Sequence, residues 1–159
     1  MPTHAHYLGG FYYSWSSFEL ILEVLCRDEL GIDDHRAHIT LSSLSAAAKQ
    51  EIAINLVSIS TRANRDEIIK CIRRIPNIAR RNHITHSLLA ANAAMTEFTF
   101  FKREIASGSL VARKLVFSGV EMQDHFKTLN DALVDLQHLI GLTDADLESY
   151  CEAIKAFVK

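Results

Sequence analysis

The stretch Arg80–His86, with the sequence RRNHITH, places polar residues inside an otherwise apolar helical pattern. Upstream of it, apolar residues recur at alternating spacings of four and three, as they do on one face of an α-helix. They are Ile68, Ile72, Ile75 and Ala79. The same spacing then leads to Asn82 and His86, after which Leu89 and Ala93 are apolar again. We therefore predict one long helix whose inward face carries an amide and an imidazole.

Polar groups on a core-facing stripe need an explanation, because each unsatisfied buried group costs on the order of 1–3 kcal/mol. A functional site is one explanation. The alternative is structural: Asn82 and His86 form a buried hydrogen-bonded pair that holds a dimer together, and Arg81 caps a helix–helix contact.

Length and composition indicate an ordinary globular chain. The 159 residues suffice for one domain with a substantial core, so we expect a single helical domain over 1–159. Apolar residues make up 48% and charged residues 23%, which is a soluble composition. A net charge of −2 provides no global basic field, so an anionic partner would have to bind a local patch.

Neither cysteines nor histidines form a convincing ligand set. The three cysteines are odd in number and share no short spacing, which suits a reducing cytoplasm and argues against a disulfide framework or a cysteine zinc site. The pairs His35/His38 and His83/His86 lack a carboxylate to complete a metal site. No apolar run has the length of a membrane span. We expect a cytoplasmic protein with no cofactor, no metal and no membrane contact.

Amphipathic patterns predict helices over about 11–30, 43–60 and 64–91, the last kinked at Pro76. The first helix is expected to bury this stripe: Phe11, Trp15, Phe18, Leu22 and Leu25. Residues 33–40 are predicted to be a polar loop. Asn64 followed by Glu67 resembles a capping box. The helix over 43–60 is expected to bury the following stripe: Leu44, Ala48, Ile52, Leu56 and Ile59.

After the motif, the spacing of apolar residues changes from a helical pattern to one typical of β-strands. Residues 96–103 and 111–117 are rich in aromatic and β-branched residues, and a turn signal over 106–109 separates them. This pattern predicts a β-hairpin. Ser118 with Glu121 forms a capping box for a helix that ends at Gly141. A short last helix begins near Thr143, with these residues inward: Leu147, Cys151, Ile154 and Val158.

The predicted fold is all-α: a four- to five-helix up-down bundle with one β-hairpin inserted at about 96–117.

The polar trio in the motif has the chemistry of phosphodiester cleavage. The guanidinium of Arg81 offers a planar fork of donors matched to phosphate oxygens. The imidazole of His86 can transfer a proton at cellular pH, and Asn82 lies one turn before it. On an ideal helix, Arg81 lies about 140° around the axis from His86. The trio would therefore converge only at the edge of a cleft, or by pooling residues from two copies of the chain.

Arg81–His86 resembles the R-x(4–6)-H signature of HEPN domains, including the polar residue directly after the arginine. The order of elements is also similar over roughly Leu44 to Ile140: a long helix that ends in the motif, a hairpin and a long amphipathic helix. The resemblance implies a homodimer in which two motif helices face each other around one cleft. For active members it implies a metal-independent endoribonuclease in which the 2′-hydroxyl attacks the adjacent phosphate.

The resemblance also implies a role for each residue of the trio. Arg81 would bind and polarise the phosphate, His86 would transfer the proton, and Asn82 would position both. A toxin or stress-defence ribonuclease, with an antitoxin protein as a partner, is the biological setting that this interpretation suggests. The alternative is a non-catalytic dimerisation or regulatory module whose partner face is the motif helix.

Basic residues cluster near the motif and on the predicted hairpin. The candidates for phosphate or RNA binding are Arg74, Arg80, His83, Lys102 and Arg103, and Arg73, Arg113 and Lys114 lie nearby in the sequence. Such a cluster is suited to an RNA backbone. The alternative is that these residues are solvated and paired with nearby acids. Phe98, Phe100 and Phe101 have two interpretations as well, stacking on bases or packing on the bundle.

Overall fold

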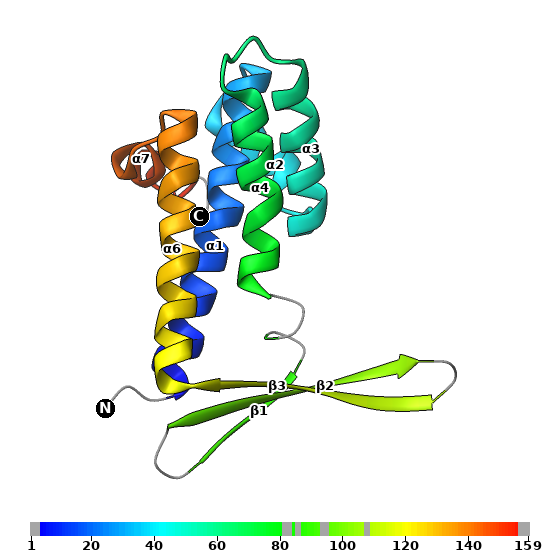
Figure 1. Cartoon of the computed structure of the whole chain (residues 1–159). Coiled ribbons are helices and arrows are strands. Elements are labelled where there is room, and N and C mark those ends of the chain that lie inside the picture. Colours follow the sequence, from blue (N-terminus) through cyan, green and yellow to red (C-terminus); the bar gives the residue numbers. More distant parts are fainter. Residues whose placement is uncertain (1–3, 81–83, 85–86, 93–95, 107–108, 156–159) are drawn as a thin grey trace.

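The computed structural model describes residues 4–80, 84, 87–92, 96–106 and 109–155 (Figure 1). Within these residues the chain forms six helices and a three-stranded antiparallel sheet. The helices are α1 (His4–Leu30), α2 (Asp34–Leu41), α3 (Ala46–Ile59), α4 (Arg65–Ala79), α6 (Gly119–Ile140) and α7 (Asp144–Lys155). The strands are β1 (Ser87–Ala91), β2 (Glu97–Ala106) and β3 (Ser109–Ser118). The predicted fold class, a mainly helical bundle with an inserted hairpin, is confirmed.

Helix α1 is the centre of the bundle. It packs against α3 and α6, and also contacts α2 and α7, while α4 packs against α6 and α3. Its buried stripe is the one predicted from the sequence: Phe11, Trp15, Phe18, Leu22 and Leu25. In Figure 1 the helices stand side by side and the sheet lies across one end of them. Among the described helices, none has the length and apolar character needed to cross a membrane.

Local capping fixes the ends of α6 as predicted. The Ser118 hydroxyl accepts from the Glu121 N–H at 3.1 Å, and the Glu121 carboxylate accepts from the Ser118 N–H at 2.7 Å. Gly141 ends the helix at φ 74°, a left-handed conformation that glycine adopts at little cost. The capping box predicted at Asn64 is wrong. Its side-chain amide instead donates to the Leu139 carbonyl at 2.7 Å, which ties the start of α4 to the end of α6.

Three predictions about the helices are wrong in detail. The expected loop at 33–40 contains α2, because Asp33 caps the Arg36 N–H at 2.9 Å and Ala37 and Leu41 face the core. The inward face of α3 is shifted by one position: it buries Lys49, Ala53 and Val57, and Ile59 is exposed. In α7 the buried residue is Tyr150, whereas Leu147, Cys151 and Ile154 are half-buried and Val158 lies outside the described residues.

The long motif helix over 64–91 is also wrong. Helix α4 ends at Ala79, and Arg80 has φ 48° and ψ 34°, in the left-handed region that a non-glycine residue seldom adopts. Residues Ser87–Ala91, expected to be helical, instead form β1, which pairs with β2. Leu89 is opposite Phe100 in this pairing and packs against the core. Its apolar character fits a helical stripe and a strand equally well.

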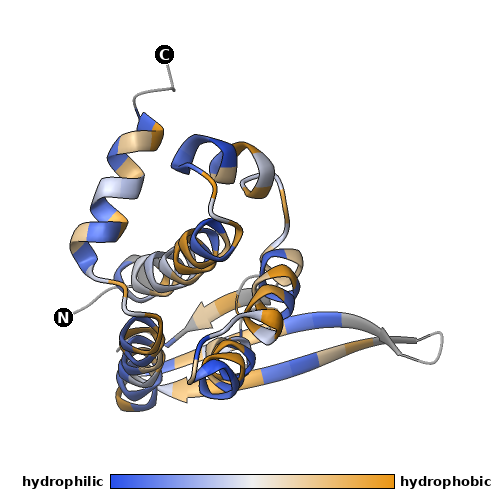
Figure 2. Ribbon diagram, turned by 90° about the horizontal axis from the view of Figure 1, so that it is seen from above, coloured by the Kyte–Doolittle hydropathy of each residue, from blue (hydrophilic) through white to orange (hydrophobic). Residues whose placement is uncertain are grey.

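The sheet has the order β1-β2-β3. The hairpin of β2 and β3 is confirmed, and its ten residue pairs run from Glu97↔Ser118 to Ala106↔Ser109. Strand β1 was not predicted, and it covers only the part of β2 from Phe98 to Lys102. The far half of the hairpin extends beyond the helices in Figures 1 and 2. We call this two-stranded part, residues 103–106 and 109–112, the arm.

Candidate functional site

The four motif residues predicted to bind or cleave RNA, Arg81, Asn82, His83 and His86, lie outside the described residues. Their neighbours locate the segment along the chain. Arg80 ends α4 on one side and Ser87 begins β1 on the other. The motif therefore connects the helical bundle to the sheet.

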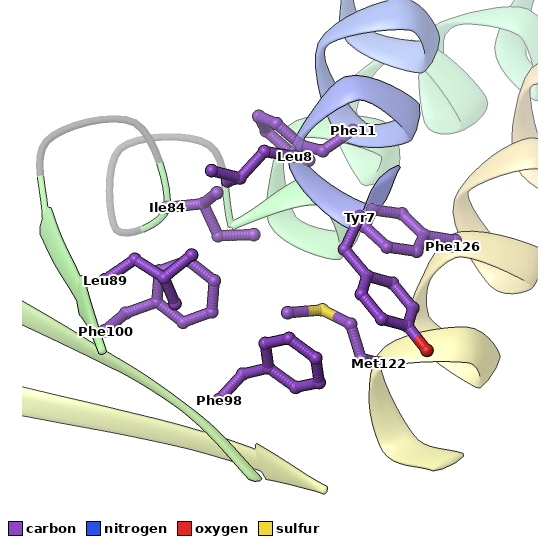
Figure 3. A pocket seen from close by; sticks show the side chains of 9 residues that line it. All are labelled: Tyr7, Leu8, Phe11, Ile84, Leu89, Phe98, Phe100, Met122 and Phe126. Carbon is purple, nitrogen blue, oxygen red and sulfur yellow. The ribbon is translucent and has the colours of Figure 1, made fainter. Parts of the chain in front are cut away.

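One residue within the motif, Ile84, is described and buried. Its N–H donates to the Arg80 carbonyl at 3.0 Å. Figure 3 shows its side chain in an apolar pocket between α1, α6 and the sheet. The other lining residues are Tyr7, Leu8, Phe11, Leu89, Phe98, Phe100, Met122 and Phe126. The cavity of about 10 Å³ is at the lower limit for one water molecule, so this pocket is part of the core and Ile84 is packed into it.

Arg80 lies where the bundle meets the sheet. Its guanidinium carbon is 5.8 Å from the centroid of the Phe117 ring on β3, within the range of a cation–π contact. Phe117 is buried, whereas Arg80 is exposed. The contact holds a positive charge at the exposed residue with which the motif begins, and the sequence analysis had proposed this residue for phosphate binding.

His125 on α6 was not singled out in the sequence, yet it lies at the same junction. Its ring is 5.3 Å from the Phe117 ring, centroid to centroid. Burial lowers the pKa of His125; a hydrogen bond with the backbone of Ala79 opposes this shift, and the charge of Arg80 adds to it. Its Nε2 is buried without a hydrogen-bond partner. A neutral imidazole with an unpartnered Nε2 therefore lies beside Ala79, the residue that precedes the motif.

Only a weak signal in the sequence points to His125. It falls three residues after Met122 and directly before Phe126, on the border of the apolar stripe of α6. That position made partial burial foreseeable, but the contact of His125 with Phe117 and the charge effect of Arg80 involve residues that are distant from it in the chain or on another element.

Arg74 lies elsewhere, in a groove of about 380 Å³ between α4 and α6. The other lining residues are Glu67, Lys70, Cys71, Asp135, His138 and Leu139. Arg74 precedes Arg80 by six residues, about 9 Å along the helix axis, so the two are not brought together. Burial raises the pKa of the Cys71 thiol, although Arg74 opposes the shift. The groove therefore holds no activated thiol nucleophile.

Basic residues cluster where the sheet narrows to the arm. Lys102 lies directly opposite Arg113, and Lys114 lies opposite Phe101, with Arg103 one position further along β2. Like charges placed opposite each other destabilise a strand pair.

Several of these cations form no ion pair with another described residue. Within the part of the chain that the structure describes, none of the ion pairs involves Arg74, Arg80, Arg103 or Lys114. For these four residues the alternative interpretation, that they are exposed and solvated cations, stands beside the RNA-binding interpretation. Their charges remain available to an external partner.

No protein-family model, no curated protein and no solved structure matches the chain.

Proposed function

We propose that this chain is a metal-independent endoribonuclease that acts as a homodimer, with Arg81, Asn82 and His86 as its catalytic residues. The observation that supports the proposal best is the local environment of Arg80. This cation begins the motif at the junction of bundle and sheet, next to Phe117 and His125. The motif is thereby attached to a rigid framework at a point where a phosphate would meet positive charge.

The proposed reaction follows from the chemistry of the three side chains. A base, assigned to His86, takes the proton from a ribose 2′-hydroxyl, whose oxygen attacks the adjacent phosphorus. The bond to the 5′-oxygen breaks, and that oxygen takes up a proton. Arg81 stabilises the charge that develops on the phosphoryl oxygens, and Asn82 orients the imidazole or the substrate. The products are a 2′,3′-cyclic phosphate and a 5′-hydroxyl.

Free positive charge near the motif supports an anionic substrate. Arg80, Arg103 and Lys114 lie at or near the sheet, and the chain as a whole carries a net charge of −2. Because the net charge of the chain is negative, attraction of an RNA backbone would have to come from this local group of cations. RNA binding should therefore weaken steeply as salt concentration rises.

Two copies are proposed because the family resemblance implies a shared cleft. The sequence analysis also argued for two copies from the angle between Arg81 and His86 on one continuous helix. That argument no longer applies, because α4 ends at Ala79. The homodimer therefore rests on the resemblance and needs its own measurement. Light scattering of the purified chain provides it.

The experiment is incubation of purified protein with mixed RNA in the presence of a chelator. We expect cleavage with cyclic phosphate ends, reduced by about 100-fold or more in His86→Ala and in Arg81→Ala. The dimer should persist in both variants. The matched control is His138→Ala, which removes an exposed imidazole at the far end of α6.

Two results would redirect the assignment. Wild-type rates in both motif variants would show that the site lies elsewhere. A wild-type protein that cuts no RNA, together with a dimer that dissociates in His86→Ala, would favour the non-catalytic assembly module. In that case there would also be no reason to propose an antitoxin partner.

A further inference from the structure

The three phenylalanines of β2 point to different sides of the sheet. Phe98 and Phe100 are 0% and 1% exposed and pack in the core beneath the helices. Phe101 is 36% exposed, because successive residues of a strand face opposite sides. An aromatic ring is thereby left on the sheet face that the bundle does not cover.

The strand register shows what surrounds this ring. Lys114 lies directly opposite Phe101 on β3, and Arg103 follows two residues along β2 on the same face. Val116, opposite Thr99, adds a second exposed apolar side chain. We call this surface the outer sheet face; it consists of Ala90, Phe101, Arg103, Lys114 and Val116, while Thr99, on the same face, is only 7% exposed.

The outer sheet face adjoins the motif. In the pairing of β1 with β2, Leu88 lies opposite Phe101. Leu88 follows His86 by two residues, so at most about 7 Å of chain separates their Cα atoms. The outer sheet face therefore includes a strand that begins directly after the proposed catalytic histidine in the chain.

The chemistry of this face favours single-stranded RNA. Unpaired bases stack on exposed aromatic rings, and cations on either side bind the connecting phosphates. A duplex keeps its bases stacked within the helix and offers no free base to such a ring. The carboxylate on the same face, Glu97, lies at the end remote from Arg103 and accepts from the Thr99 hydroxyl at 3.4 Å.

A second copy of the chain is a poorer fit to the outer sheet face. A symmetric pair places the same surface on both subunits, so the cations Arg103 and Lys114 of one copy would face a surface that carries the same two cations. A stable interface also needs about 800 Å² from each partner, and this face offers only a few apolar side chains.

We propose that the outer sheet face binds single-stranded RNA, with a base stacked on Phe101 and backbone phosphates bound by Lys114 and Arg103. The inference rests on the proposed function and identifies unpaired RNA as its substrate class. It assigns one role, RNA binding, to the exposed ring of Phe101 and to the cations Lys114 and Arg103.

The test measures fluorescence anisotropy of a labelled 2′-O-methyl oligouridine of about 12 nucleotides, a length that spans one binding surface. This probe cannot be cleaved, because it lacks a free 2′-hydroxyl. We expect Phe101→Leu to weaken binding by about 5- to 20-fold and Phe101→Tyr to preserve it. Lys114→Ala and Arg103→Ala should each lower the salt dependence by about one counterion.

A matched control separates stacking from the mere loss of an aromatic ring. Tyr13→Leu removes a ring that is 77% exposed on α1, and it should leave the affinity unchanged. Circular dichroism confirms that each variant is folded. An RNA duplex of the same length should bind more weakly and without dependence on Phe101.

The outcomes distinguish this inference from the proposed function. If the wild type cleaves RNA and Phe101→Leu binds the probe as tightly as wild type, the inference is wrong and the nuclease stands. If binding depends on Phe101 but no RNA is cut, the face is correct and the catalytic proposal fails. If Phe101→Leu dissociates a dimer without changing RNA affinity, or the wild type binds no probe, the inference is overturned.

Discussion

The ammonium of Lys49 lies 2.5 Å from a carboxylate oxygen of Glu23 in the interior of the helical bundle. The two residues are 4% and 6% exposed. The other oxygen of Glu23 accepts from the Tyr150 hydroxyl at 3.2 Å, and Lys49 is 3.4 Å from Glu19. This network joins α1, α3 and α7, so buried charge connects elements that are distant in the sequence.

Lys49→Met should strongly destabilise the protein, because it leaves the Glu23 carboxylate buried without its cation. Breaking one side of a buried ion pair costs about 3–5 kcal/mol. Urea unfolding of wild type and variant measures the difference. The double variant Lys49→Met/Glu23→Leu removes both charges and should recover part of the loss. A single variant within about 1 kcal/mol of wild type would mean that water already solvates the pair.

This network also explains why the stripe of α3 was misplaced. Hydropathy alone selects Ile52, Leu56 and Ile59 as the inward face, since a lysine is seldom buried. The chain buries Lys49 because Glu23 on α1 pairs with it. The sequence of α3 alone does not indicate that Glu23 is its partner.

Other elements were predictable because their signals are local. The aromatic stripe of α1 and the capping box of α6 depend on residues within a few turns, and both are confirmed. The end of α4 and strand β1 could not be predicted in this way, because β1 is specified by its pairing with β2, which follows it in the chain. In the candidate site, the sequence pointed to Arg80 but not to His125, whose neighbours come from α4 and β3.

Replacing Arg80 tests whether its left-handed backbone conformation determines where α4 ends. Arg80→Gly and Arg80→Ala both remove the contact with Phe117, but only glycine adopts φ 48° without steric cost. We expect Arg80→Gly to be more stable than Arg80→Ala by about 1 kcal/mol. Thermal or urea unfolding of the two variants, compared directly, measures the difference. Equal stabilities would indicate that the chain can leave α4 in another conformation.

His125 should make the folded protein sensitive to mild acid. Above about pH 6.5 the imidazole is neutral in both the folded and the unfolded state, so it adds no pH dependence. Below that pH the unfolded chain binds a proton, but the folded protein, with its lowered His125 pKa, binds it only at still lower pH. Stability contributed by the neutral imidazole is therefore lost as pH falls below about 6.5.

Urea unfolding at neutral pH and at about pH 5 measures this effect. His125→Gln should lose less stability between the two conditions than wild type, because glutamine does not titrate. His138→Gln, an exposed position on the same helix, is the matched control and should lose as much as wild type. A His125→Gln variant with the full wild-type pH dependence would show that acid acts through other groups. Protonation of the half-buried His125 would then not contribute to the acid sensitivity of the fold.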